Sequence, residues 1–261
     1  MPVPVAASVP WPIFVISLDI ATQRRADIEA QMTREGLSFT YIDALDGRNG
    51  LPPEYEHLVD REGTVALHGY PMGDGEFACA ISHQMVYRRI IDEGLPGAIV
   101  LEDDAILTPQ FVDFYRNGGY LSAEVIQLFC FAARIWRGPG RAIAPGVHLH
   151  RLAENAFMTV GYTMSRKAAD FMIRKSVPLR ARADWPTDMT QIGIMLTIPS
   201  IIQHPKPEGQ ISYIADTSST HWVGDFDFSS KYPKGWRRLI SASAWSRFFM
   251  KRFSREIRPG F

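Results

Sequence analysis

The sequence predicts an α/β domain built on a buried sheet with parallel-type strands. Short apolar runs of strand length end in polar or acidic residues, at residues 13–18, 39–42 and 98–101. The segments between these runs carry apolar residues at helical spacing, so strands and helices alternate along the chain. Ligands of open α/β sheets bind beyond the carboxyl ends of the strands. We therefore expect a functional site among the polar residues that follow the apolar runs.

The first apolar run, residues 13–18, ends at Asp19 and leads into a basic turn with Arg24 and Arg25. A helical segment then reaches Arg34, and residues 39–42 form the next strand before an acidic turn. Because arginine presents a bidentate fork to phosphates, we expect Arg24 or Arg25 to contact a phosphate or nucleotide, with Asp19 beside them.

A glycine-containing loop at residues 73–75 precedes a long predicted helix. Apolar positions recur at helical spacing as far as Ile91, and Gly94 and Pro96 then end the helix. The preceding residues 51–74 include two adjacent prolines and show no sustained period, so they predict an excursion or loop that covers a bound ligand.

Three consecutive carboxylates, Glu102, Asp103 and Asp104, follow the apolar run at residues 98–101. Two unit charges ~4 Å apart repel by roughly 4 kcal/mol at an effective dielectric constant of 20, so this loop needs a cation or generous solvation. Hard oxygen ligands favour Mg²⁺ or Mn²⁺. The alternative is an acidic loop that ends a strand and faces water.

The second half of the chain is less regular. Residues 125–131 and 142–149 are predicted strands joined through a turn at residues 137–141, and residues 157–164 form another strand. Ser165 then caps a helix that continues through Arg174. Asp184 and Asp188 flank an aromatic–proline pair, and Asp188 or Thr187 is expected to cap a helix over residues 192–195 unless it has a catalytic role.

Composition is compatible with one catalytic domain and a short tail. The 261 residues are 46% hydrophobic and carry no net charge. We expect a cytoplasmic protein, because no basic region precedes Arg24, no apolar stretch approaches ~20 residues, and the two cysteines, Cys79 and Cys130, are far apart in sequence.

Although the chain as a whole carries no net charge, its C-terminal tail is strongly basic. Residues 231–261 hold nine basic residues against one acid, a net charge of +8, interleaved with aromatic residues. This composition is typical of an amphipathic helix on an anionic membrane, here the inner membrane. The alternative is a C-terminal helix that packs its apolar side on the domain. No nucleic-acid-binding module is recognisable, so no nucleic-acid partner is expected.

Several motifs together resemble glycosyltransferase family 25, the bacterial lipooligosaccharide galactosyltransferases and their relatives in collagen glycosylation. They occur in order between residues 12 and 205: VISLD, YIDALDGR, GEFACAISH, EGLPGAIVLEDDA and GYTMSRKAADFMI. The resemblance implies a GT-A-like (Rossmann-like) mixed sheet with flanking helices, an inverting reaction and a nucleotide-sugar donor. It also implies a metal held by Glu102 and Asp104, with Asp103 in the donor site.

The resemblance further assigns expected roles outside the acidic motif. Asp184 or Asp188 is the expected general base, although the family's flanking Pro-Val is absent before Asp184. Ser82 and His83 match a Ser-His of the family and are expected in the donor site, with a structural hydrogen bond of His83 as the alternative to ligation. His221 is the expected third metal ligand, with Asp216 and His204 as competitors.

These observations predict a GT-A-like catalytic domain over residues 11–222 and a basic amphipathic tail over residues 231–261. We expect a metal-dependent hexosyltransferase, with UDP-galactose as the favoured donor and a lipid-linked surface glycan as acceptor. One alternative is another metal-dependent nucleotide enzyme, such as a nucleotidyltransferase, but the turn after Leu18 lacks the glycines expected for it. The other is a glycosyltransferase-like binding protein that has lost catalysis.

Overall fold

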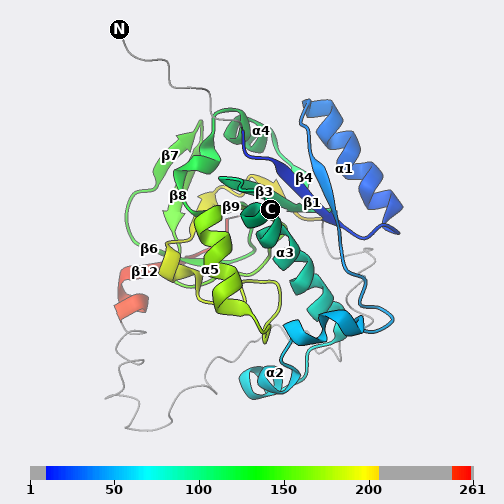
Figure 1. The fold of residues 1–261 in the computed structure, drawn as a ribbon. Coiled ribbons are helices and arrows are strands. Elements are labelled where there is room, and N and C mark those ends of the chain that lie inside the picture. Colours follow the sequence, from blue (N-terminus) through cyan, green and yellow to red (C-terminus); the bar gives the residue numbers. More distant parts are fainter. Residues whose placement is uncertain (1–9, 206–248, 260–261) are drawn as a thin grey trace.

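An eight-stranded mixed sheet forms the centre of the protein, with helices on both faces (Figure 1). The computed structural model describes residues 10–205 and 249–259. The sheet has the strand order β2-β1-β3-β9-β5-β10-β8-β7. Its strands are β1 (Ile13–Ser17), β2 (Thr40–Asp43), β3 (Gly97–Glu102), β5 (Val125–Gln127), β7 (Arg141–Ala144), β8 (Val147–Arg151), β9 (Gly161–Ser165) and β10 (Met195–Ile198).

Two further strand pairs and several helices complete the fold. The pairs are β4 (Ile106–Leu107) with β11 (Ile202–Gln203), and β6 (Ala133–Trp136) with β12 (Ser254–Ile257). The α-helices are α1 (Thr22–Glu35), α2 (Arg61–His68), α3 (Asp74–Asp92), α4 (Pro109–Arg116) and α5 (Arg166–Ser176). Short 3₁₀ helices are η1 (Pro53–Leu58), η2 (Gly119–Ser122) and η3 (Met189–Ile192).

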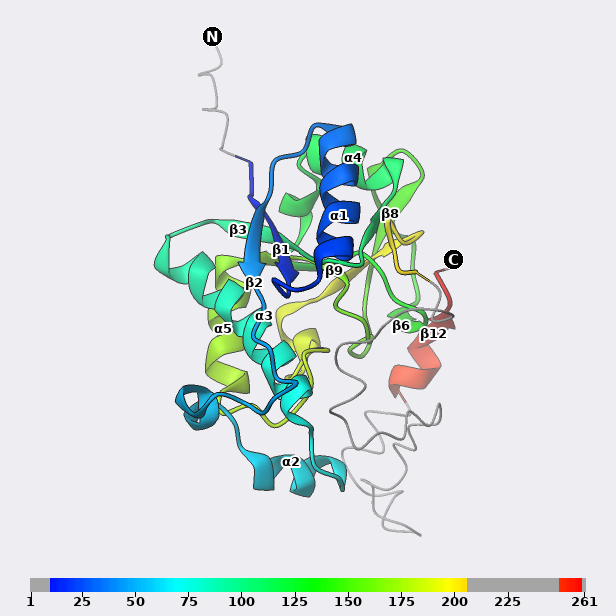
Figure 2. The same ribbon diagram turned by 90° about the vertical axis from the view of Figure 1, so that its right-hand side faces the viewer.

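The sheet is buried on both faces because its central strands are mostly apolar, and every residue of β1, β5 and β9 is buried. Successive side chains of a strand point to opposite faces, so Val15 packs in one core with Ile28 of α1, whereas Ile16 packs in the other with Val86 of α3 and Met172 of α5. Helices α1 and α4 therefore cover one face and α3 and α5 the other, while α2 lies at the opposite end of the molecule from α1 and α4 (Figure 2).

Strand direction brings several chain segments to one edge of the sheet. Strands β2, β1 and β3 are parallel. Strand β9 runs antiparallel between β3 and β5, and β10 is parallel to β5. The carboxyl ends of β1, β3 and β5 consequently lie at the edge where β9 begins.

The predicted strands at residues 13–18, 39–42 and 98–101 are confirmed, as are the predicted helices that reach Arg34 and Ile91. Ser165 caps α5 as expected, accepting a hydrogen bond of 3.1 Å from the backbone N–H of Ala168. The strand predicted at residues 125–131 ends at Gln127, and residues 142–149 form parts of two strands, β7 and β8, instead of one.

Two predictions of local structure are wrong. Residues 51–74 contain η1 and α2, whose start is capped by the Asp60 carboxylate through a 2.8 Å bond from Gly63 N–H. The expected helix over residues 192–195 is a single 3₁₀ turn that ends at Gly193, where φ is +78°. Residues 195–198 then form β10, which pairs parallel to β5 and antiparallel to β8.

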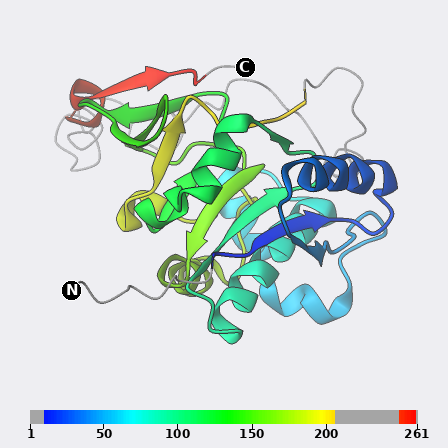
Figure 3. The ribbon, with the colours of Figure 1, turned by 90° about the horizontal axis from the view of Figure 1, so that it is seen from above.

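The tail is described only from residue 249 to residue 259. Residues 249–253 are helical, but Ser254–Ile257 form strand β12 antiparallel to β6, so the predicted amphipathic helix does not continue there. The segment is a strand there because it forms backbone hydrogen bonds with β6 and buries Ser254. Strand β12 lies at the opposite end of the molecule from α1 (Figure 3). Among the described helices, none has both the length and the apolar character needed to cross a membrane.

Candidate active site

The acidic motif lies at the carboxyl edge of the sheet, where strands from four parts of the chain meet. Glu102 ends β3 and pairs in register with Ile16 of β1. Its backbone N–H donates to the carbonyl of Val160, just before β9. The motif therefore sits between the end of β1 and the start of β9, as the strand order requires.

Asp103 is held by two donors from the first strand–helix unit. Its carboxylate accepts a 2.7 Å hydrogen bond from the hydroxyl of Ser17 and a 3.0 Å bond from Arg24. Burial raises the pKa of this carboxyl, while the bonds from Ser17 and Arg24 oppose that rise. Asp103 thus ties the acidic loop to β1 and α1.

The two arginines of the basic turn have different surroundings. Arg24 contacts Asp103 and also lies 3.2 Å from Asp104. Arg25 lies over the Tyr41 ring and bonds Asp43 at 2.7 Å and the Ser17 carbonyl at 3.1 Å. Arg25 accordingly clamps the ends of β1 and β2, whereas Arg24 places positive charge on the acidic motif.

Asp104 has one buried carboxylate oxygen, Oδ1, with no hydrogen-bond partner among the described residues. Its other oxygen lies 3.2 Å from Arg24 and 3.5 Å from Nε2 of His204. Hydrogen bonding to Asp104 raises the pKa of His204, partly offset by burial. An unpartnered buried carboxylate oxygen costs free energy, which a cation bound at this position would relieve.

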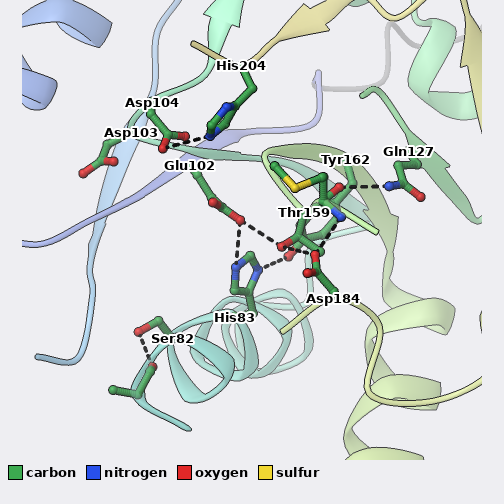
Figure 4. Close-up of polar contacts among 12 residues, drawn as sticks. Ser82, His83, Glu102, Asp103, Asp104, Gln127, Thr159, Tyr162, Asp184 and His204 are labelled. Atoms are coloured by element: carbon green, nitrogen blue, oxygen red, sulfur yellow. Dashed lines mark hydrogen bonds and ion pairs between the residues drawn. The ribbon is translucent and has the colours of Figure 1, made fainter. Parts of the chain in front are cut away.

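Glu102 lies over a chain of buried polar groups. Nε2 of His83 is 3.4 Å from the Glu102 carboxylate, and Nδ1 of the same ring is 2.8 Å from the hydroxyl of Tyr162. The Tyr162 hydroxyl donates in turn to that of Tyr87 at 3.2 Å. The His83 ring also stacks on Tyr162, so helix α3 and strand β9 support Glu102 from beneath (Figure 4).

Asp184 lies close to Glu102 of the acidic motif, with Thr159 between the two carboxylates. Its Oδ1 accepts a 2.8 Å hydrogen bond from the backbone N–H of Met158 and lies 3.5 Å from the hydroxyl of Thr159. That hydroxyl donates to Glu102 at 2.8 Å, so one threonine spans the two carboxylates (Figure 4). Burial, and then the charge of Glu102, raise the pKa of Asp184, whereas the Met158 bond lowers it.

Asp188 does not join this cluster. It is exposed and caps η3, accepting bonds from the backbone N–H of Thr190 at 3.0 Å and from the Thr190 hydroxyl at 2.6 Å. The capping role predicted as its alternative is therefore present, and Asp184 is the carboxylate of this segment that lies near the acidic motif.

Two other expected site residues lie apart from the cluster. Ser82 is buried and bonds the Ala78 carbonyl at 2.7 Å and the backbone N–H of Leu45 at 2.9 Å, which fixes α3 to the segment after β2. Asp19 is exposed beyond the end of β1. His221 and its competitor Asp216 lie outside the described residues, whereas the other competitor, His204, lies beside Asp104.

Sequence reasoning missed Thr159, Tyr162 and Gln127. Thr159 and Tyr162 flank the start of β9, which the strand prediction had included without assigning them a role. Gln127 interrupts an apolar run, VIQLFCF, and is fully buried at the end of β5. A buried glutamine needs hydrogen-bond partners, so a glutamine within an apolar run is the sequence signal that could have identified Gln127.

The residues at the motif fit a divalent metal in part. Over residues 10–205 and 249–259, no group of three His, Cys, Asp or Glu side chains is arranged to hold an ion. The oxygen without a partner on Asp104 and the adjacent imidazole of His204 nevertheless offer a donor pair suited to Mn²⁺. Further ligands would come from Glu102, from a bound diphosphate or from residues beyond Pro205.

Comparison with known proteins identifies several relatives. The family model for glycosyltransferase family 25 (LPS biosynthesis protein) matches residues 11–190. The lacto-N-neotetraose biosynthesis glycosyltransferase LgtB of Neisseria gonorrhoeae is 30% identical over 188 residues, covering 69% of this chain and 66% of its own length.

Two other relatives match at similar identity. The lipooligosaccharide biosynthesis protein lic2B of Haemophilus influenzae is 28% identical over 59% of each chain. The probable inactive glycosyltransferase 25 family member 3 of Rattus norvegicus is 31% identical over 88% of this chain and 42% of its own. The chain thus matches slightly less than two thirds of the gonococcal relative and less of these two.

Proposed function

The chain belongs to glycosyltransferase family 25, and from this membership we propose that it transfers a hexose from a nucleotide sugar to a saccharide acceptor. The observation that carries the proposal is the pairing of Glu102 and Asp184 across Thr159, beside Asp103 and Asp104. All of these residues lie within the segment that matches the family. The mixed sheet with helices on both faces is compatible with a GT-A-like fold.

The donor is proposed to bind over the acidic motif. Arg24 lies at the edge of the sheet with 23% of its side chain exposed, so it can present its guanidinium to a phosphate. A divalent ion bound there, Mn²⁺ or Mg²⁺, would offset the negative charge that develops on the leaving diphosphate. Asp104, His204 and Glu102 are the described residues that would hold this ion, with His221 as a further candidate.

Asp184 is the proposed general base. An acceptor hydroxyl must lose its proton as it attacks the anomeric carbon, and one positioned carboxylate contributes on the order of 10²- to 10⁴-fold to such a step. The raised pKa of Asp184 makes it a better proton acceptor than a solvated aspartate. The attack occurs from the face opposite the leaving group, so the product has inverted configuration.

Galactose is the proposed sugar and a lipid-linked surface glycan the proposed acceptor. The relatives in Neisseria and Haemophilus are named for lacto-N-neotetraose and lipooligosaccharide biosynthesis. The rat relative is named as probably inactive, but the carboxylates Glu102, Asp104 and Asp184 present here favour catalysis in this chain.

The basic tail supports a proposed peripheral position on the cytoplasmic face of the inner membrane. Lys251 and Arg252 are exposed, and the exposed rings of Phe249 and Phe253 lie parallel with their centroids 6.3 Å apart. Anionic lipid attracts each cation near its surface by about 1 kcal/mol, and aromatic side chains favour the interface. Docking there would place the site close to a lipid-anchored acceptor.

A panel of nucleotide sugars tests the proposed function. Purified protein should release nucleoside diphosphate from one of them, with UDP-galactose expected first, and Mn²⁺ should increase the rate. Addition of saccharide acceptors should convert this hydrolysis into transfer. If a folded protein neither hydrolyses nor transfers from any nucleotide sugar, the proposal is wrong. Binding of a nucleotide sugar without turnover would instead indicate a binding protein that has lost catalysis.

A further inference from the structure

Gln127 is the most heavily hydrogen-bonded buried side chain near the site. Its amide nitrogen lies 2.9 Å from the carbonyl oxygens of Phe157 and Met158, 3.1 Å from that of Phe129 and 3.3 Å from that of Ala156. Its amide oxygen accepts a 3.2 Å bond from the indole N–H of Trp185. The orientation of the amide is fixed, because only the nitrogen end can face four carbonyls and only the oxygen end can face an indole N–H.

These contacts hold two strained backbone positions. Met158 and Trp185 are the non-glycine residues with positive φ among the described parts of the chain, at +82° and +55°. Such conformations cost about 1–3 kcal/mol each and persist only where the surroundings enforce them. Gln127 bonds both residues, one through its backbone carbonyl and the other through its indole ring.

The strained positions determine where the two carboxylates lie. The positive φ of Met158 directs its backbone N–H to Asp184 at 2.8 Å, and the next residue, Thr159, donates to Glu102 at 2.8 Å. Trp185 follows Asp184 directly and fixes the backbone on its other side. Gln127 contacts neither carboxylate, yet it bonds Met158, which donates to Asp184, and Trp185, which follows Asp184 in sequence.

We propose that Gln127 is a positioning residue, which holds the 156–159 loop and Trp185 so that Thr159 and the Met158 N–H set the separation and orientation of Glu102 and Asp184. This inference rests on the proposed function, because it assigns the two carboxylates to opposite sides of one reaction centre. The alternative is that Gln127 contributes to folding alone, as is expected of Gln84, the other buried glutamine among the described residues.

Gln84 provides a matched control for that alternative. It is also a buried glutamine, and its amide nitrogen donates to the Ser176 hydroxyl at 2.6 Å, which joins α3 to α5. Methionine has similar length and no amide, so Gln127→Met and Gln84→Met make the same change at comparable depth, although Gln84 makes fewer hydrogen bonds than Gln127. A purely structural role predicts equal losses of activity for equal losses of thermal stability.

The positioning role predicts a different result. Gln127→Met should lower kcat by about 100-fold, the size expected when reacting groups shift by about 1 Å, while the KM for the donor stays nearly unchanged. Gln84→Met should keep kcat. Similar losses of kcat in both variants, or a raised donor KM with unchanged kcat for Gln127→Met, would overturn the proposal.

Thr159 gives a second route to the same conclusion if Gln127→Met folds poorly. Thr159→Val removes the hydroxyl that spans the carboxylates and should lower kcat, whereas Thr159→Ser keeps the hydroxyl and should restore most of it. Thr163→Val is the control, since that buried hydroxyl accepts the backbone N–H of Ile126 at 3.2 Å and contacts neither carboxylate among the described residues. Equal activity of the Val and Ser variants at position 159 would refute the spanning role.

A measurement that needs no substrate separates this proposal from the proposed function. NMR titration of the Asp184 carboxyl, identified by its loss in Asp184→Asn, should show a higher pKa in Gln127→Met than in wild type, because the Met158 N–H no longer stabilises the carboxylate. The charged groups near Asp184, namely Glu102, His83 and Arg182, are unchanged in that variant. An unchanged titration would overturn the positioning role even if no nucleotide sugar is ever found to react.

Discussion

Replacement of Asp184 by asparagine tests the proposed base with the smallest change of shape. Asparagine can still accept the hydrogen bond from the Met158 N–H, 2.8 Å away in the structure, but it cannot accept the acceptor's proton. Loss of general-base catalysis should lower kcat by ~10² to 10⁴, which corresponds to about 2.7 to 5.5 kcal/mol of activation free energy. The KM for the donor should change little, because Arg24 and Asp103 lie on the other side of Glu102.

The same substitution should not destabilise the protein at neutral pH. The folded-state pKa of Asp184 is raised by burial and by Glu102, so the folded state favours the neutral carboxyl. The stability this contributes is complete below the unfolded-state pKa of about 3.9 and is lost as pH rises through the folded-state pKa. Asparagine is neutral throughout, so Asp184→Asn should unfold at the wild-type temperature or above it at pH 7.

The assay is steady-state transfer and donor hydrolysis, with thermal unfolding measured on the same samples. Asp188→Asn is the matched control, since Asp188 caps η3 and asparagine caps equally well. Its kcat and unfolding temperature should match wild type. Reduced kcat in Asp188→Asn with normal kcat in Asp184→Asn would refute the assignment, and a large loss of stability in Asp184→Asn would refute the electrostatic argument.

Three further predictions concern the donor, the metal and the tail. Arg24→Ala should raise the donor KM more than it lowers kcat, and a dominant loss of kcat would argue against a phosphate contact. Glu102→Ala and Asp104→Ala should each abolish Mn²⁺ stimulation while the protein stays folded, and unchanged metal dependence in both would exclude the motif. Deletion from Lys234 onward, or Lys251→Gln with Arg252→Gln, should release the protein from anionic vesicles at low salt while donor hydrolysis persists, and unchanged binding would exclude docking through the tail.

The two tail variants differ in what they can decide. Deletion also removes β12, which pairs with β6 along Ala133–Trp136 and buries Ser254. A truncated protein that aggregates would therefore indicate that the tail braces the domain. The double glutamine variant keeps β12 and changes only two exposed side chains, so its vesicle binding reports on charge alone.

The sequence predicts the sheet and the acidic edge well because both depend on local pattern. The apolar runs of β1 and β3 specify buried strands, and their parallel pairing then brings Ser17 and Glu102 to one edge. The strand at residues 195–198 is different, because a short and largely apolar segment is equally compatible with a helix. Pairing with β5 and β8, which are distant in sequence, decides the outcome.

The partners of the site residues depend on contacts that no local pattern encodes. Thr159 meets Glu102 across 57 positions of sequence, and His204 meets Asp104 across 100, so neither contact follows from spacing. The distinction between Asp184 and Asp188 also needs the fold. Both flank the same Trp-Pro pair, but only Asp184 is adjacent to the strained Met158 that approaches the acidic motif.

The configuration of the product tests the central claim most directly. Wild-type protein incubated with UDP-galactose, Mn²⁺ and a panel of saccharide acceptors should form a new glycoside, whose anomeric configuration proton NMR can assign. Since the donor is α-linked, an inverting reaction with Asp184 as base predicts a β-galactoside, and its formation should fall by ~10² to 10⁴ in Asp184→Asn. An α-linked product, or undiminished β-galactoside formation by Asp184→Asn, would contradict the account.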